Sequence, residues 1–147
     1  MQFSQHYSLE QANDLLPTVI DVFFIVRPLH KRLLREAAQM RADGFVPDLS
    51  GRPLRGKLPT EVAGRQRHIR QLSLAIQQQL RELLLLDIEI QSAEGVVAFK
   101  SRFEARSVLL CWRWDQDRII AYHELGESFS ERKAIVDGSL FTGDEVN

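Results

Sequence analysis

One feature restricts the fold of this 147-residue chain more than any other: the spacing of apolar residues near its start. From Leu9 to Met40 they recur at alternating steps of three and four, which is the spacing of one buried helix face. His30 is the single polar interruption. The face consists of Leu9, Ala12, Leu16, Val19, Phe23, Val26, Leu33, Ala37 and Met40.

Local signals set the limits of this helix. Ser8 and Gln11 form a capping box, in which each side chain bonds the other residue's backbone N–H. Pro17 and Pro28 each remove a helical hydrogen bond, which costs about 3 kcal/mol of stability in a straight helix. Their separation is close to a whole number of turns, so both bend the helix in the same direction. We predict one curved helix over residues 9–42, with a break at Leu16 as the alternative.

A second heptad-spaced segment predicts a helix over residues 60–86. Its seam contains Val62, Arg65, Ile69, Leu72, Ile76, Gln79, Leu83 and Leu86. Residues 43–59 between the two helices are rich in glycine and proline and predict a loop, so the helices form an antiparallel hairpin. A second apolar stripe on the first helix, at Leu15, Val22 and Leu29, predicts a homodimer through a four-helix arrangement.

After Leu86 the apolar period falls to two, which is typical of strands. The alternation predicts strands near residues 87–91, 95–100, 107–114 and 119–125. We predict a single α+β domain over residues 1–147, a long antiparallel helical hairpin packed on an antiparallel meander of three to four strands. Residues 87–136 hold the sheet and a closing segment, and residues 137–147 form a loose tail.

Composition and charge narrow the class of protein. A single cysteine excludes an internal disulfide and favours a cytoplasmic location, and no segment has the length of a membrane span or the pattern of a signal peptide. Residues 22–81 carry twelve Lys and Arg against four acidic residues, whereas the C-terminal part is acidic. The two parts can attract each other, and the basic part can also meet a polyanion.

The segment from residue 109 to 125 contains the only cysteine and both tryptophans. If the loop between its strands is even, Trp112 opposes Ala121, and Cys111 and His123 point to opposite faces of the sheet. If the loop is odd, Leu109 opposes His123, and Cys111 and His123 share one face. The even pairing matches tryptophan with apolar partners, so we favour it, and with it a structural role for Cys111 and His123.

Four motifs together resemble a known family, the bacterial domain-of-unknown-function family 2203. The motifs are YSLEQANDLLP (Tyr7–Pro17), LCW (Leu110–Trp112), YHEL (Tyr122–Leu125) and FSER (Phe129–Arg132). The resemblance spans nearly the whole chain and implies fold and kinship, since no activity is established for that family. It marks Glu10, Asn13, Cys111, Trp112, His123 and Arg132 as motif positions for binding.

This chain departs from the family pattern at one strand. The family's Gly-Leu-Val-Asp-Phe resembles residues 95–99 here, where Ala98 replaces the acidic residue. A chemistry that depends on that carboxylate would be lost, while a binding or structural role survives the loss more easily.

A metal site at Glu10, His123 and Glu124 is the alternative use of these residues, although the chain has no spaced ligand pair such as C-x-x-C or H-E-x-x-H. The competing interpretation is structural, with Glu10 paired to Arg132 or His123 and Asn13 supporting the bent helix.

The basic stretch from residue 51 to 70, with Arg65, Arg67 and Arg70, is the candidate for nucleic-acid binding. It lacks interleaved aromatic residues, and we favour a solvated face or a contact with the acidic part.

We therefore predict a non-enzymatic binding or assembly module that acts through its hairpin and sheet surface on an unknown protein partner. It has no P-loop, no dinucleotide fingerprint and no nucleophile elbow. We predict no cofactor and no membrane contact. A small metal-dependent enzyme or metal-binding protein is the second hypothesis, and a nucleic-acid-binding protein is the third.

Overall fold

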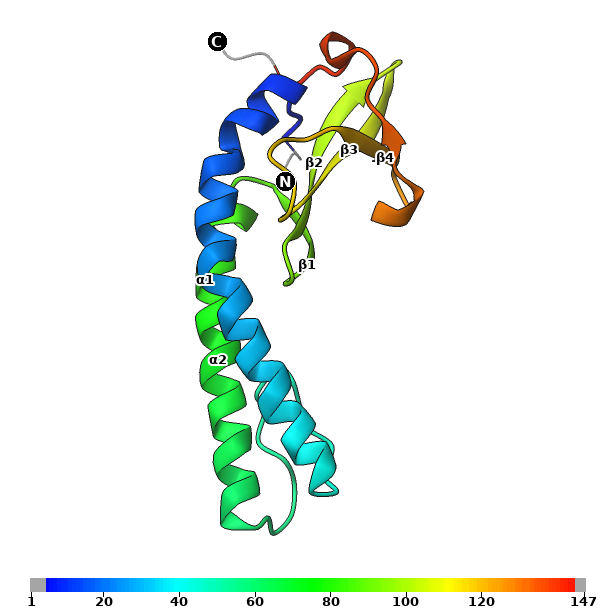
Figure 1. Ribbon diagram of the computed structural model, residues 1–147. Coiled ribbons are helices and arrows are strands. Elements are labelled where there is room, and N and C mark those ends of the chain that lie inside the picture. Colours follow the sequence, from blue (N-terminus) through cyan, green and yellow to red (C-terminus); the bar gives the residue numbers. More distant parts are fainter. Residues whose placement is uncertain (1–4, 145–147) are drawn as a thin grey trace. The chain divides into compact units, whose positions relative to one another are not determined.

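The computed structural model describes residues 5–144, and the chain forms two compact units. Of the described residues, 5–23 and 82–144 form the sheet unit, and 24–81 form the hairpin unit. Helices α1 (Leu9–Ala42) and α2 (Thr60–Leu85) contribute to both units (Figure 1). Among the residues described, no helix combines the length and apolar character that a membrane crossing needs.

Helix α1 is continuous through both prolines, so the alternative of a break at Leu16 is wrong. The capping box is confirmed, because Gln11 N donates to Ser8 Oγ at 3.0 Å and Ser8 N donates to Gln11 Oε1 at 2.9 Å. The predicted apolar face is confirmed as well: all its members except Leu9 are buried. Local periodicity alone therefore identified this helix and the side it buries.

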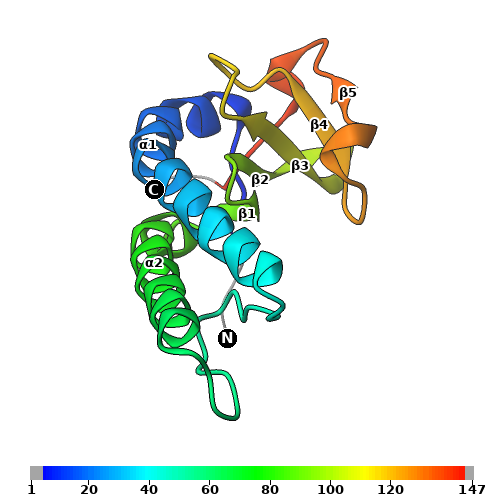
Figure 2. The ribbon, with the colours of Figure 1, turned by 60° about the horizontal axis from the view of Figure 1, so that its bottom comes forward.

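The sheet has five strands rather than the three to four predicted, all antiparallel and in chain order (Figure 2). They are β1 (Glu89–Ser92), β2 (Val96–Phe103), β3 (Arg106–Arg113), β4 (Ala121–Glu124) and β5 (Lys133–Ala134). The fifth strand pairs only two residues with β4. Such a short edge strand carries too little alternation to be recognised from sequence.

One face of the sheet forms the core of the sheet unit with the start of α1. Phe99 and Leu110 are paired across β2 and β3, and both are fully buried. The ring of Trp112 lies 6.5 Å from that of Phe23 on α1, and Phe99 meets Tyr7 edge-to-face at 5.6 Å. These aromatic contacts join the helix to the sheet and bury large apolar side chains.

Residues near the two ends of the chain cover the edge of β2 where β1 has ended. Tyr7 N donates to Lys100 O, and Arg102 and Thr142 exchange two backbone hydrogen bonds. Phe141 is buried and stacks on Phe103 at 4.5 Å. The prediction of a loose tail is therefore wrong for residues 137–144, which are fixed by backbone pairing and aromatic packing. Residues 145–147 lie outside the described part.

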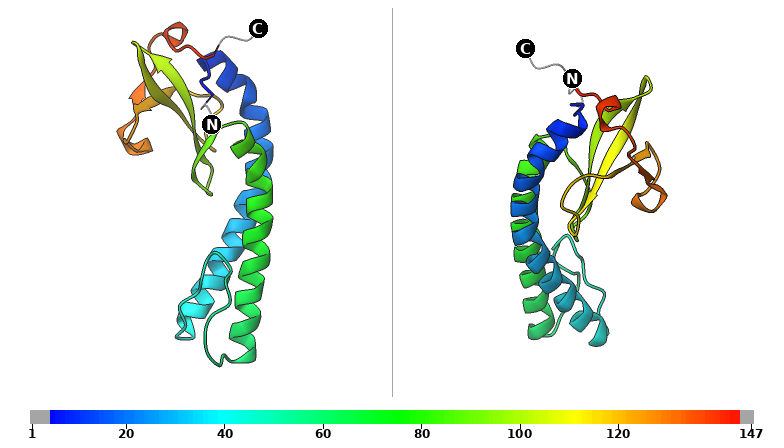
Figure 3. Two further views of the ribbon diagram at one scale, coloured as in Figure 1. Left: turned by 180° about the vertical axis from the view of Figure 1, so that it is seen from behind. Right: turned by 45° about the horizontal axis from the view of Figure 1, so that its top comes forward.

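In the hairpin unit, α1 and α2 run antiparallel. Glu36 accepts a hydrogen bond from Arg65 Nη1 at 3.2 Å and lies 3.5 Å from His68 Nδ1. Between the helices, residues 43–59 form the predicted loop, which returns along them before α2 begins (Figure 3). Buried Gln66 holds this loop, since its amide donates to Asp48 O at 2.8 Å and to Arg52 O at 3.0 Å.

Candidate functional site

The register of β3 and β4 decides which motif residues share a face of the sheet. Leu109 opposes His123, and Cys111 opposes Ala121, so the favoured even register is wrong and the odd alternative is correct. In this register Ile119 N does not pair with β3 but donates to Asn13 Oδ1 on α1 at 2.8 Å. Ile119 is thereby held in the connection, and β4 begins only at Ala121.

Cys111 and His123 thus lie on the face turned away from α1, which we call the distal face. Neither residue is poised to react. Burial raises the pKa of the Cys111 thiol to about 11, against a smaller opposing effect of Arg132. His123 is fully buried; its Nδ1 lies 3.0 Å from Glu124 O, which can only accept, so Nδ1 carries the proton. Its Nε2 then accepts from the Gln91 amide at 3.4 Å.

The Cys111 thiol is therefore expected to resist alkylation in the folded protein. Iodoacetamide at pH 8 should label it at least about 100-fold more slowly than it labels free glutathione, because only the exposed thiolate reacts. Intact-mass spectrometry over time measures the rate, and the same protein in denaturant provides the control. Labelling of the native protein at the rate of the denatured protein would contradict a buried, neutral thiol.

Next to these residues the distal face is hollowed by a pocket of about 370 Å³, which we call the sheet pocket. It is lined by Asp87, Glu89, Ala98, Lys100, Leu109, Leu125 and Gly126. The strand register explains this lining: Glu89 opposes Ala98, and Lys100 follows two residues later on the same face opposite Leu109. Three charged groups therefore surround an apolar floor.

The three charged side chains of the sheet pocket differ in whether they bond to other parts of the protein. Asp87 accepts a hydrogen bond from Gln5 N at 3.1 Å and adopts a positive φ of 58°. Within residues 5–144, the Lys100 ammonium and the Glu89 carboxylate form no ion pair or side-chain hydrogen bond. Half-buried Lys100 and exposed Glu89 are thus available to a ligand.

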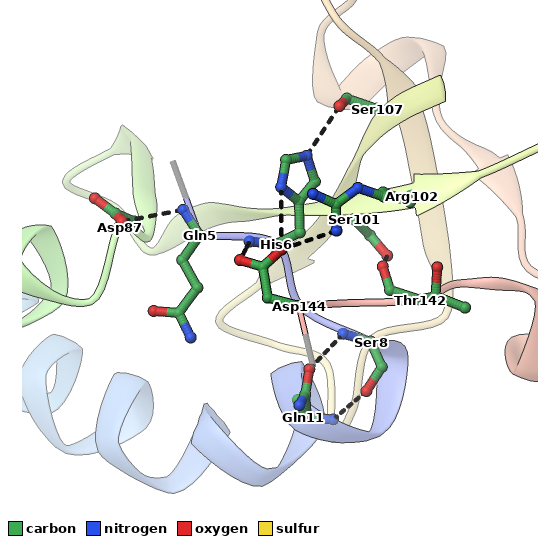
Figure 4. Close-up of polar contacts among 10 residues, drawn as sticks. All are labelled: Gln5, His6, Ser8, Gln11, Asp87, Ser101, Arg102, Ser107, Thr142 and Asp144. Carbon is green, nitrogen blue, oxygen red and sulfur yellow. Dashed lines mark hydrogen bonds and ion pairs between the residues drawn. The ribbon is translucent and has the colours of Figure 1, made fainter. Parts of the chain in front are cut away.

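His6, Ser107, Asp144 and Arg102 form a polar cluster (Figure 4). His6 Nε2 is 2.9 Å from Ser107 Oγ, while Asp144 Oδ1 is 3.9 Å from His6 Nδ1. This resembles a Ser-His-Asp arrangement in composition. The last distance, however, is too long for the hydrogen bond that would orient the imidazole as a base.

The carboxylate of Asp144 is engaged elsewhere in this cluster. It accepts from His6 N at 3.0 Å and from Arg102 Nη1 at 2.8 Å, and these two bonds, in that order, lower the pKa of Asp144. Asp144 N in turn donates to His6 O. These contacts of His6, Arg102 and Asp144, which we call the terminal clamp, fix the first and last described segments on the sheet.

The predicted metal ligands Glu10, His123 and Glu124 do not come together. Glu10 is exposed in the first turn of α1, beside a groove of about 550 Å³ shared with residues 138–144. The Glu124 carboxylate binds Arg106 Nε at 2.6 Å, and both nitrogens of His123 are occupied. In the part of the chain that is described, no three His, Cys, Asp or Glu side chains are grouped to hold a metal. His123 and Glu124 are consecutive residues of β4 and therefore point to opposite faces of the sheet, while Glu10 belongs to α1.

The other motif residues have structural contacts. Trp112 is 1% exposed and donates from Nε1 to Gln116 O at 2.9 Å. Arg132 stacks over Phe129 at 4.1 Å, and Arg113 approaches the same ring at 5.3 Å. Of the predicted nucleic-acid residues, Arg65 is paired with Glu36, whereas Arg67 and Arg70 line a different pocket in the hairpin unit.

Replacing Asn13 by alanine is expected to cost about 1–2 kcal/mol of unfolding free energy, because it leaves the backbone N–H of Ile119 without an acceptor. Asn13→Asp keeps an oxygen at this position and should retain most of the stability. Urea denaturation measures both changes, and hydrogen exchange at the Ile119 amide locates them. Equal losses in the two variants would show that the hydrogen bond is not the cause.

Comparison with known proteins agrees with the motifs. The model of the family described as uncharacterized conserved protein (DUF2203) matches residues 5–135. The chain belongs to the DUF2203 family. No curated protein and no solved structure matches it. The DUF2203 range contains every residue that lines the sheet pocket, whereas Asp144 of the terminal clamp lies beyond it.

Proposed function

We propose that this protein is a non-enzymatic binding protein and that the sheet pocket holds a small zwitterion of the α-amino-acid type. The observation that carries the proposal is the pairing of available charges of both signs with an apolar floor. Lys100 would bind the ligand carboxylate, Glu89 and Asp87 would face its ammonium, and Leu109 and Leu125 would contact its apolar side chain.

The size and position of the pocket support this proposal. A volume of about 370 Å³ is at the small end of the range of ligand pockets, which suits a compact molecule rather than a large cofactor. Lys100 and Glu89 project from adjacent paired strands, so backbone hydrogen bonds fix the positions of their Cα atoms, and only the two side chains have to become ordered when a ligand binds. Charge-assisted hydrogen bonds at such a site are stronger than those between neutral groups.

Titration calorimetry with the twenty common α-amino acids tests the proposal. For any amino acid that binds, Lys100→Met and Glu89→Gln should each weaken the affinity by at least about tenfold, which corresponds to 1.4 kcal/mol. Lys133→Met is the matched control, because Lys133 is exposed on β5 and does not line the pocket. If leucine binds, removal of either its amino group or its carboxylate should reduce the affinity.

Two results would overturn the proposal. One is the absence of millimolar or tighter binding by all twenty amino acids to the folded wild-type protein. The other is binding that neither Lys100→Met nor Glu89→Gln weakens. The homodimer, the cytoplasmic location and a protein partner remain predictions from the sequence.

A further inference from the structure

The loop of residues 43–59 is built onto α2 in a way that encloses a second pocket. Besides its two donated bonds, Gln66 accepts from Asp48 N at 3.3 Å, so one buried side chain fixes both ends of a short loop segment. At Gly51 the loop backbone touches the helix: an added Cβ would lie 2.4 Å from Arg70 Cα. The loop is therefore attached to α2 at defined points.

The space between this loop and α2 measures about 280 Å³, and we call it the loop pocket. Pro53, Leu54 and Leu58 form its loop side, and Ala63, Arg67 and Arg70 form its helix side. Its wall is largely apolar, and its charged groups are the guanidinium groups of Arg67 and Arg70. An apolar cavity with a few charged groups is the usual construction of a small-molecule site.

The charges around the loop pocket are predominantly positive. The hairpin unit carries twelve Lys and Arg against four acidic residues, and Arg52, Arg55 and Lys57 belong to the loop itself. Asp48, an acid of the same loop, is engaged with Ser50, whose hydroxyl and N–H lower the pKa of this carboxylate. Glu36 is engaged with Arg65 and His68. None of the residues that line the pocket carries a carboxylate.

Arg67 and Arg70 differ from Arg65 in this respect. Within residues 5–144, neither guanidinium forms an ion pair or a side-chain hydrogen bond, although both lie at the wall of the pocket. A guanidinium can bind a carboxylate, sulfonate or phosphate with two parallel hydrogen bonds. Because Arg67 and Arg70 are three residues apart on one helix, their head groups can act on the same anion.

We propose that the loop pocket binds a small organic anion, in which one acidic group sits on an apolar body. The acidic group lies against Arg67 and Arg70, and the apolar body contacts Pro53, Leu54 and Leu58. This site is independent of the sheet pocket, and it uses the basic segment for a small molecule rather than for a nucleic acid, whose phosphate backbone would leave the apolar wall unused.

The test uses 8-anilinonaphthalene-1-sulfonate, an aromatic anion whose fluorescence rises on binding, and the uncharged N-phenyl-1-naphthylamine as its matched probe. The double substitution Arg67→Gln and Arg70→Gln should weaken binding of the anion at least about tenfold and leave binding of the neutral probe within about twofold. Arg81→Gln, on the same helix but outside the pocket, should change neither. Displacement by octanoate against phenyl phosphate then distinguishes a carboxylate ligand from a phosphate ligand.

Several results would overturn this inference. Unchanged binding of the anion in the double variant would remove the role of the arginines, and equal loss of both probes would indicate damage to the apolar wall. Loss of anion binding in Lys100→Met would place the probe in the sheet pocket instead. Circular dichroism of each variant shows whether the helices are retained. If neither octanoate nor phenyl phosphate displaces the probe, the loop pocket is not a site for small organic anions.

Discussion

Replacing Trp112 by alanine is expected to lower the free energy of unfolding by about 3–5 kcal/mol. Trp112 is the largest of the fully buried side chains, it contacts Phe23 of α1, and its Nε1 donates to Gln116 O. Its removal leaves a cavity between helix and sheet that the paired strands cannot close. Chemical denaturation followed by circular dichroism measures the loss.

Trp114 provides the matched control for this substitution. It is the same residue type two positions further along the chain, yet 47% of its surface is exposed. Trp114→Ala should cost about 1 kcal/mol or less, and Trp112→Phe, which keeps an aromatic ring without the donor, should fall between the two. Similar losses at Trp112 and Trp114 would mean that the first does not lie at the helix–sheet interface.

Replacing Gly51 by alanine is expected to cost about 2–4 kcal/mol and to release the loop from α2. Gly51 has a φ of 87°, which an alanine adopts only at a cost of about 1 kcal/mol, and the added Cβ would meet the Arg70 backbone at 2.4 Å. The backbone of a helix cannot yield as a flexible side chain would. Denaturation measures the stability, and limited trypsin digestion measures exposure of Arg55 and Lys57.

Gly56 distinguishes the cost of the positive φ from the cost of the contact with Arg70. It lies in the same loop with a nearly equal φ of 89°, but an added Cβ there would have nothing within 4 Å. Gly56→Ala should therefore show only the conformational cost, with tryptic cleavage close to that of the wild type. If the two variants lose equal stability and are cleaved equally fast, the contact between Gly51 and Arg70 is not made.

The helices could be predicted almost residue by residue, and the reason is physical. Each helix buries one face, and burial of one face imposes a period that remains visible over 34 residues in α1 and 26 in α2. Ser8 and Gln11 then fix the start of α1 through contacts only three residues apart. Every determinant of these elements is local or periodic.

The sheet was harder to predict because its decisive contacts are not local. Strand β5 has two residues, and the described part of the C-terminal tail is held by a backbone bridge between Arg102 and Thr142. The sheet pocket collects residues from several segments, and none of Asp87, Glu89 and Lys100 belongs to a motif. His6 and Asp144, which meet in the terminal clamp, are separated by almost the entire chain.

The sequence by itself determined two amphipathic helices, their buried faces, the loop between them and an antiparallel meander. Only the tertiary structure decided the register of β3 and β4, and with it that Cys111 and His123 share the distal face. The alternation of side chains is compatible with either register, and the two differ by one residue. The observed register is accompanied by a tertiary hydrogen bond from Ile119 N to Asn13 Oδ1 on α1, and a contact between residues 106 positions apart leaves no local trace in the sequence.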